Sequence, residues 1–85
     1  MNKADIERII AEQGLTAYFN ARSTVRGNGT EINYLYVYAI EGRGKQRKRY
    51  GLGAFEQVSM MSEAYLAELV RTKVNKEKES GHSGH

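Results

Sequence analysis

The spacing of apolar residues changes along the chain, from a helical period near the N-terminus to alternation in the middle and back to a helical period. Near the N-terminus, apolar residues recur three and four positions apart, which predicts a helix over residues 3–13. Asn2 is a suitable N-cap for this helix, and Gly14 is a natural stop. The apolar stripe consists of Ile6, Ile9 and Ile10. Because so short a helix is marginal in isolation, we expect it to dock on the rest of the chain.

The middle of the chain predicts three antiparallel strands joined by two turns. A first strand over 16–26 leads into residues 27–30, whose Asn-Gly pair indicates a tight hairpin turn. A second strand over 32–40 alternates aliphatic residues with tyrosines. A looser, glycine-containing turn at 41–45 precedes a third strand that spans about 46–52.

The last predicted element is a second helix, which begins after Ser59 as its N-cap. Its broad apolar face consists of Met61, Ala64, Tyr65, Leu66, Leu69, Val70 and Val74. Residues 80–85 contain only Gly, Ser and His and are expected to form a disordered tail, which leaves residues 1–79 as a single small domain. The expected fold is α+β: an N-terminal helix, a three-stranded antiparallel sheet, and a C-terminal helix packed on one sheet face.

Side chains alternate between the two faces of a strand, so the predicted sheet divides into two sets of residues. One face is mainly aliphatic and would lie under the C-terminal helix; it contains Phe19, Ala21, Leu35, Val37, Ala39 and Leu52. The opposite face contains Asn20, Arg22, Thr24, Arg26, Tyr34, Tyr36, Tyr38, Arg47 and Arg49. The N-terminal helix decides whether this second face is open, because it can pack either across that face or beside the C-terminal helix.

Positive charge is concentrated in the predicted sheet. The formal net charge of the chain is +3. Residues 17–53 hold seven of the 13 Lys and Arg residues and two of the 10 Asp and Glu residues, so this part carries +5 and the remainder −2. Arg43, Lys45 and Lys48 belong to the second turn or border it. A basic centre between acidic flanks is the electrostatic footprint of a protein that binds a polyanion.

The polar face has the chemistry that reads double-stranded DNA. Arginine bonds to the edge of guanine and asparagine to the edge of adenine, and tyrosine hydroxyls reach phosphates. We therefore expect Arg22, Arg26, Arg47 and Arg49 to contact bases or phosphates. Phosphate contacts are expected from Arg43, Lys45 and Lys48, and contacts to the backbone or to methyl groups from Tyr34, Tyr36 and Tyr38. Asn20 and Thr24 complete the predicted DNA-binding set.

The run from Gly44 to Ser59 resembles two families of DNA-binding domain. Its Leu-Gly-x-Phe-x-x-Val-Ser pattern is similar to the arm-site-binding N-terminal domain of phage and island tyrosine recombinases; the matching residues are Leu52, Gly53, Phe55, Val58 and Ser59. The same Leu-Gly-x-Phe, followed by a helix with Ala64-Tyr65, resembles the plant ethylene-response-factor DNA-binding domain. Both families have a three-stranded antiparallel sheet packed on one helix, and both read the major groove with the sheet.

The resemblance covers about residues 16–74 and implies DNA contacts from the sheet strands. It departs from the recombinase pattern at Glu56, where that family usually has proline. The predicted N-terminal helix lies outside the core pattern of both families. The resemblance does not imply recombinase activity, because the match does not include a catalytic domain.

Two other functions fit the same residues. The tyrosine face or the stripe of Ile6, Ile9 and Ile10 can serve as a protein-interaction or dimerisation surface, because exposed apolar patches usually mark a binding site. The tyrosines can also stack on the bases of RNA or of a single DNA strand.

Catalytic and metal-binding groups are sparse, so we expect neither an enzyme nor a cofactor. The chain has no cysteine and a single aspartate, Asp5. His82 and His85 have ligand-like spacing but no third ligand nearby, so no metal site is expected. No apolar run reaches the length of a membrane span, about 18 residues. We expect a cytoplasmic protein that is nucleoid-associated or encoded by a phage or mobile element, with a regulatory or integrative role.

Overall fold

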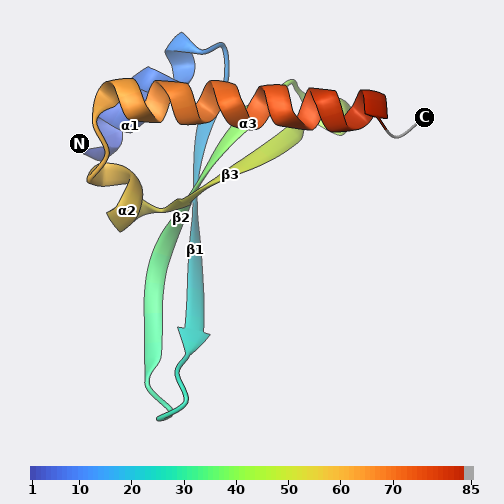
Figure 1. Cartoon of the computed structure of the whole chain (residues 1–85). Helices are drawn as coiled ribbons and strands as arrows, with labels where there is room; N and C mark the ends of the chain where they lie inside the picture. Colours follow the sequence, from blue (N-terminus) through green and yellow to red (C-terminus); the bar gives the residue numbers. More distant parts are fainter. Residues whose placement is uncertain (84–85) are drawn as a thin grey trace.

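The computed structural model describes the backbone of residues 1–83 and the side chains of residues 1–77. It confirms the expected α+β fold, with an N-terminal helix, a three-stranded antiparallel sheet and a C-terminal helix (Figure 1). In chain order the elements are α1 (Lys3–Glu12), β1 (Thr16–Val25), β2 (Glu31–Glu41), the 3₁₀ turn η1 (Gly44–Gln46), β3 (Lys48–Ala54), α2 (Phe55–Ser59) and α3 (Glu63–Ser83).

The central strand, β2, has neighbours of unequal length. It pairs with β1 from Glu31 to Ile40, but β3 pairs only with Tyr36–Glu41. Residues 21–35, which we call the distal ribbon, therefore continue as a two-stranded hairpin beyond the end of β3. Figure 1 shows this ribbon projecting away from the three helices. The sheet thus has a backed, three-stranded part and an unbacked, two-stranded part.

All three helices bury their apolar residues against one face of the sheet. The shared core contains Ile6, Ile9, Ile10, Leu15, Val37, Ala39, Tyr50, Leu52, Val58, Leu66, Val70 and Val74. Because the α1 isoleucines join the α3 residues in this core, α1 packs beside α3 and not across the tyrosine face. The same burial removes Ile6, Ile9 and Ile10 from the surface of the folded chain.

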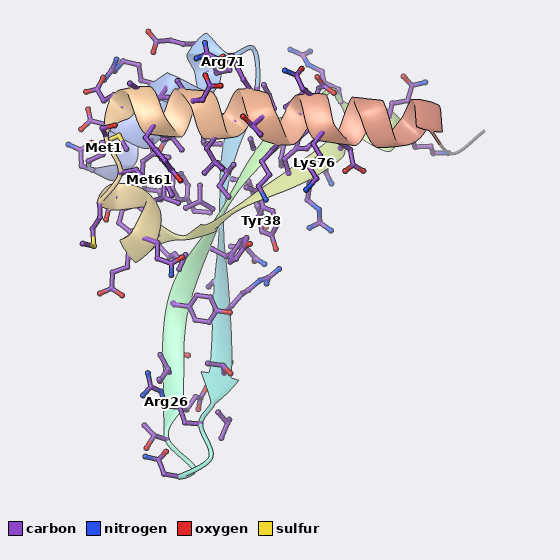
Figure 2. The ribbon with its side chains drawn as sticks, viewed as in Figure 1. Met1, Arg26, Tyr38, Met61, Arg71 and Lys76 are labelled. Atoms are coloured by element: carbon purple, nitrogen blue, oxygen red, sulfur yellow. The ribbon has the colours of Figure 1, made fainter. Side chains whose placement is uncertain are left out.

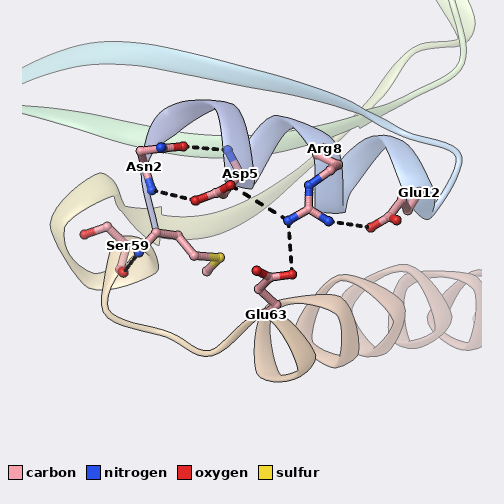
Figure 3. Close-up of polar contacts among 7 residues, drawn as sticks. Asn2, Asp5, Arg8, Glu12, Ser59 and Glu63 are labelled. Atoms are coloured by element: carbon pink, nitrogen blue, oxygen red, sulfur yellow. Dashed lines mark hydrogen bonds and ion pairs between the residues drawn. The ribbon is translucent and has the colours of Figure 1, made fainter.

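Local signals define both ends of α1, as the sequence predicts. The Asn2 side chain accepts from the backbone N–H of Asp5, and the Asp5 carboxylate accepts from the N–H of Asn2, which makes a capping box (Figure 3). At the C-terminal end, Gly14 takes a φ of +82°, and the N–H of Leu15 donates to the carbonyl of Ile10. This pair of features is the Schellman stop that glycine favours.

An ion pair links α1 to the start of α3. The Arg8 guanidinium lies 3.0 Å from the Glu63 carboxylate, and weaker pairs join it to Asp5 and Glu12 (Figure 3). The side chains are about half exposed. Solvent screening therefore keeps this contribution small, and the buried isoleucines supply most of the docking energy of α1.

The start of the C-terminal helix differs from the prediction. Residues 55–59 form the separate short helix α2, and the hydroxyl of Ser59 bonds back to the carbonyl of Glu56 within it. Ser62 caps α3 instead, because its hydroxyl accepts from the N–H of Tyr65 at 3.1 Å. The Ser59 cap assignment is therefore wrong by three positions.

The third strand begins at Lys48 and ends at Ala54, two residues later at each end than expected. The delay arises because Gly44–Gln46 form a 3₁₀ turn, entered through Gly42 at a φ of +83°. A β-bulge follows in β3. Gly51 lies opposite Tyr38 and Gly53 lies opposite Val37, so Leu52 is the extra residue, with no partner in β2.

Helix α3 runs to Ser83 and thus includes residues 80–83 of the expected tail. Residues 84 and 85 of the expected tail lie outside the described part of the chain, as does the side chain of His82. Within the described residues, no helix has the length and apolar character needed to cross a membrane.

Candidate nucleic-acid interface

Cross-strand pairing confirms the division of the strands into two faces. Tyr18 lies opposite Tyr38, and the pairs from Asn20 with Tyr36 to Thr24 with Ile32 continue the same face. We call this surface the open face; it comprises Tyr18, Asn20, Arg22, Thr24, Ile32, Tyr34, Tyr36, Tyr38, Ile40, Arg49 and Gly51. None of its residues belongs to the core cluster. The face therefore lies on the side of the sheet away from the helices.

Tyr38 is the centre of the open face. It is 8% exposed, and among the described residues it is the one buried hydrophobic side chain outside the core cluster. Its cover comes from neighbours on the same face. The guanidinium of Arg22 donates to the Tyr38 hydroxyl, and the guanidinium of Arg49 lies 5.6 Å from the Tyr38 ring centre. Arginine and tyrosine are thus packed together on this face.

A second tyrosine extends this stack toward β3. The Tyr36 ring centre lies 4.9 Å from that of Tyr38, and the Arg22 guanidinium lies 4.6 Å from the Tyr36 ring centre. Gly51 makes room for the ring, because a Cβ at this position would approach the Tyr36 hydroxyl to 3.0 Å. The glycine, whose role the sequence alone does not reveal, is therefore a part of the site.

The stacked arginines remain accessible to a ligand. Arg22 and Arg49 are both exposed. A guanidinium has five N–H donors in a planar fork, so the single bond to Tyr38 leaves Arg22 further donors. Stacking restricts the rotamers of both arginines, which lowers the entropy they lose when they bind a partner.

The remaining predicted contacts lie at the two ends of the sheet. Arg26 follows the last residue of β1, where its N–H bonds to the carbonyl of Thr30 at 2.9 Å across the distal turn. Gly29 in this turn has a φ of +85°, as a three-residue hairpin loop requires. The ribbon side chains of Arg22, Thr24 and Arg26 are exposed, whereas those of Asn20 and Tyr34 are half-buried.

The second group of cations lies at the opposite end of the sheet from the distal turn. Arg43, Lys45 and Arg47 are exposed in and beside the 3₁₀ turn that joins β2 to β3. Arg47 precedes the first residue of β3, so it is not part of a strand pair. Lys48 lies opposite Glu41 in the register of β2 and β3, on the core side of the sheet. Arg49 is therefore the one member of the basic run that lies within the open face.

Sequence reasoning missed three further residues. Tyr18 is 44% exposed, and its ring centre lies 6.2 Å from that of Tyr38 on the open face; it was not among the predicted contacts. Lys73 and Lys76 of α3 line a cleft beside Arg49. No local pattern indicates these lysines, because their position depends on how α3 is rotated against β3.

A groove of about 450 Å³ lies behind the distal ribbon, lined mainly by apolar side chains that include Ala21, Leu35 and Phe55. Within the described residues, no group of three or more His, Asp or Glu side chains is placed to hold a metal ion. The concentration of cations and tyrosines on the open face makes that face the candidate site.

Comparison of the chain with protein-family models, with curated proteins and with solved structures gives no match. The resemblance to the recombinase arm-binding and ethylene-response-factor domains therefore stays a prediction that rests on the quoted residues.

Proposed function

We propose that this protein binds double-stranded DNA with its open face, and that the distal ribbon enters the major groove. One observation carries the proposal: arginines are held against tyrosines on the open face, and these arginines are exposed. The distal ribbon extends this face beyond the end of β3. The location of α1 supports the proposal, because α1 packs on the other side of the sheet.

The dimensions of the ribbon suit a DNA groove. The major groove is about 12 Å wide and admits a two-stranded β-ribbon, whose strands lie about 4.8 Å apart. The five residue pairs of the distal ribbon extend about 17 Å at 3.4 Å per residue. The side chains of Arg22 and Thr24 on this ribbon can reach base edges, Arg22 to guanine and Thr24 to a thymine methyl group.

Cations at the other end of the sheet are suited to phosphates. Arg43, Lys45 and Arg47 are exposed on a turn, where they can neutralise backbone charges without entering the groove. If about five phosphates are engaged, the logarithm of affinity falls with the logarithm of salt concentration with a slope of about −4 to −5.

Two observations support the proposal of duplex DNA over the other predicted ligands. Single-strand binding needs exposed aromatic faces, but Tyr38 is buried and Arg22 lies over Tyr36. A partner surface built on the α1 isoleucines would require these buried side chains to leave the core. The tyrosine face as a protein-docking surface is the remaining competitor.

The test is a titration of the protein with random-sequence duplex DNA, single-stranded DNA and RNA over a range of salt concentrations. We expect the duplex to bind most tightly. Changing Arg47 and Arg49 together to Ala should weaken duplex binding at least about tenfold and flatten the salt slope. The matched control is Arg71→Ala, because Arg71 is exposed on α3 and pairs with Glu68 away from the open face.

A single Arg26→Ala variant tests the ribbon separately. Arg26 is exposed at the distal turn, so its removal should leave the thermal unfolding temperature close to that of the unmodified protein. Duplex affinity should nevertheless fall severalfold. The proposed DNA-binding face would be contradicted if duplex DNA bound with equal affinity to Arg26→Ala, to the double variant and to the control.

A further inference from the structure

A cleft beside the open face joins β3 to α3. It has a volume of about 330 Å³ and is lined by Arg49, Tyr50, Gly51, Lys73, Lys76 and Glu77. Figure 2 shows Lys76 on the side of α3 that faces β3, and Arg71 on the opposite side of the same helix. Helical spacing places Lys73 and Lys76 on one side, since residues three apart are neighbours on a helix surface.

The charge of this cleft is positive. Three of its lining side chains are cations, and one, Glu77, is a carboxylate. The ion pairs of the described residues centre on Arg8 and Arg71, and neither lysine of the cleft takes part in them. The cleft thus brings together three cations from two elements, although Arg49 and Lys73 are 24 positions apart in the chain.

Arg49 connects the cleft to the open face. It pairs with Ile40 across the sheet, and its guanidinium lies over the ring of Tyr38. A duplex that places its groove against the open face would therefore bring one bordering backbone toward the two lysines. Lysine ammonium groups bind phosphate oxygens as point charges, and such contacts set the orientation of a protein on the duplex.

We infer that Lys73 and Lys76, next to Arg49, each bind a backbone phosphate of the duplex that contacts the open face. This inference rests on the proposed function. It extends the interface from the sheet to α3, which the sequence places outside the DNA-binding region. The lysines contribute affinity and orientation, whereas the sheet contributes the preference for particular base pairs.

The test compares three single variants, Lys73→Gln, Lys76→Gln and Arg71→Gln, in the full chain. Each removes one positive charge from α3, but Arg71 lies on the side away from β3. A phosphate contact adds about 0.9 to the magnitude of the salt slope for duplex binding. We expect Lys73→Gln and Lys76→Gln each to reduce the slope by about one, and the double variant by about two. Arg71→Gln should keep the original slope.

The outcomes separate the two proposals. If the unmodified protein binds duplex DNA but all three variants keep its salt slope, or all lower it equally, the α3 contact is refuted and the open-face proposal stands. If the unmodified protein does not bind duplex DNA, both fail. Circular dichroism spectra of the variants, compared with that of the original protein, establish that α3 is intact. Relative affinities for different duplex sequences should stay unchanged in the lysine variants, since phosphate contacts carry no base information.

Discussion

The two faces of the sheet both bury side chains, but they do so by different means. On the core face, Val37 and Ala39 are fully buried in a cluster with apolar residues of all three helices. On the open face no helix contributes, and Tyr38 is covered by the side chains of Arg22 and Arg49 from neighbouring strands. The first kind of burial holds the fold together, and the second holds two charged groups in place.

This contrast shows that a buried residue need not belong to the core. Tyr38 lies at the base of a cluster of arginine and tyrosine side chains on a surface that stays accessible to a partner. A binding site of this type is partly ordered before its ligand arrives, so less entropy is lost on binding. A sheet face made only of mobile lysines would lack this advantage.

The largest effect should come from the core. Leu66 is fully buried in α3, and its change to Ala should lower the free energy of unfolding by about 2–5 kcal/mol. The matched control is Leu35→Ala on the distal ribbon, where Leu35 is 37% exposed. Its cost should be less than about 1 kcal/mol. Urea denaturation measures both, and equal losses would contradict the division between the backed sheet and the ribbon.

A smaller effect should come from the centre of the open face. Tyr38→Phe removes the hydroxyl that accepts from Arg22 while it keeps the ring, and we expect a loss of about 1 kcal/mol in the free energy of unfolding. Tyr18→Phe is the control on the same face, because Tyr18 is 44% exposed. The NMR signals of the Arg22 guanidinium should move in the first variant and stay in place in the second. Unchanged signals in both would mean that Tyr38 does not position Arg22.

The smallest effect should appear at alkaline pH on the core face. Burial raises the pKa of Tyr50 above its usual value of about 10, and so does the hydrogen bond from its hydroxyl to Glu41. The unfolded chain therefore loses this proton at a lower pH than the folded protein does. Stability contributed by Tyr50 is complete below about pH 10 and declines as the pH rises through the pKa of the folded state.

Replacement of Tyr50 with Phe removes this contribution. The variant should lose less stability than the original protein between about pH 9 and pH 11. Thermal unfolding at a series of pH values measures the difference. Tyr65→Phe serves as the control, because Tyr65 is 59% exposed on α3 and its removal should leave the pH profile unchanged. A profile for Tyr50→Phe identical to that of the control would argue against the buried, hydrogen-bonded phenol.

Local patterns were enough to predict α1, the three strands, the C-terminal helix and most of the open face, but not the separate helix α2. Alternation in the strands assigned Arg22, Tyr36 and Tyr38 to one surface, because adjacent side chains of a strand point to opposite sides. The same reasoning failed at the start of the third strand, because the glycine-containing turn extends further along the chain than expected. Arg47 was assigned to that strand but precedes it, whereas Leu52 is buried in the core as expected, although it is the extra residue of the register shift.

Tertiary structure decided three matters that no local pattern contains. It packed α1 beside α3, which left the tyrosine face without a helix. It buried Tyr38 under arginines from β1 and β3, and it brought Lys73 and Lys76 next to Arg49. The amino-acid sequence by itself determined which residues share a strand face or a helix side, because those periodicities are set by backbone geometry. Which faces meet was decided only in the folded chain, because that depends on how the apolar surfaces of distant segments fit together.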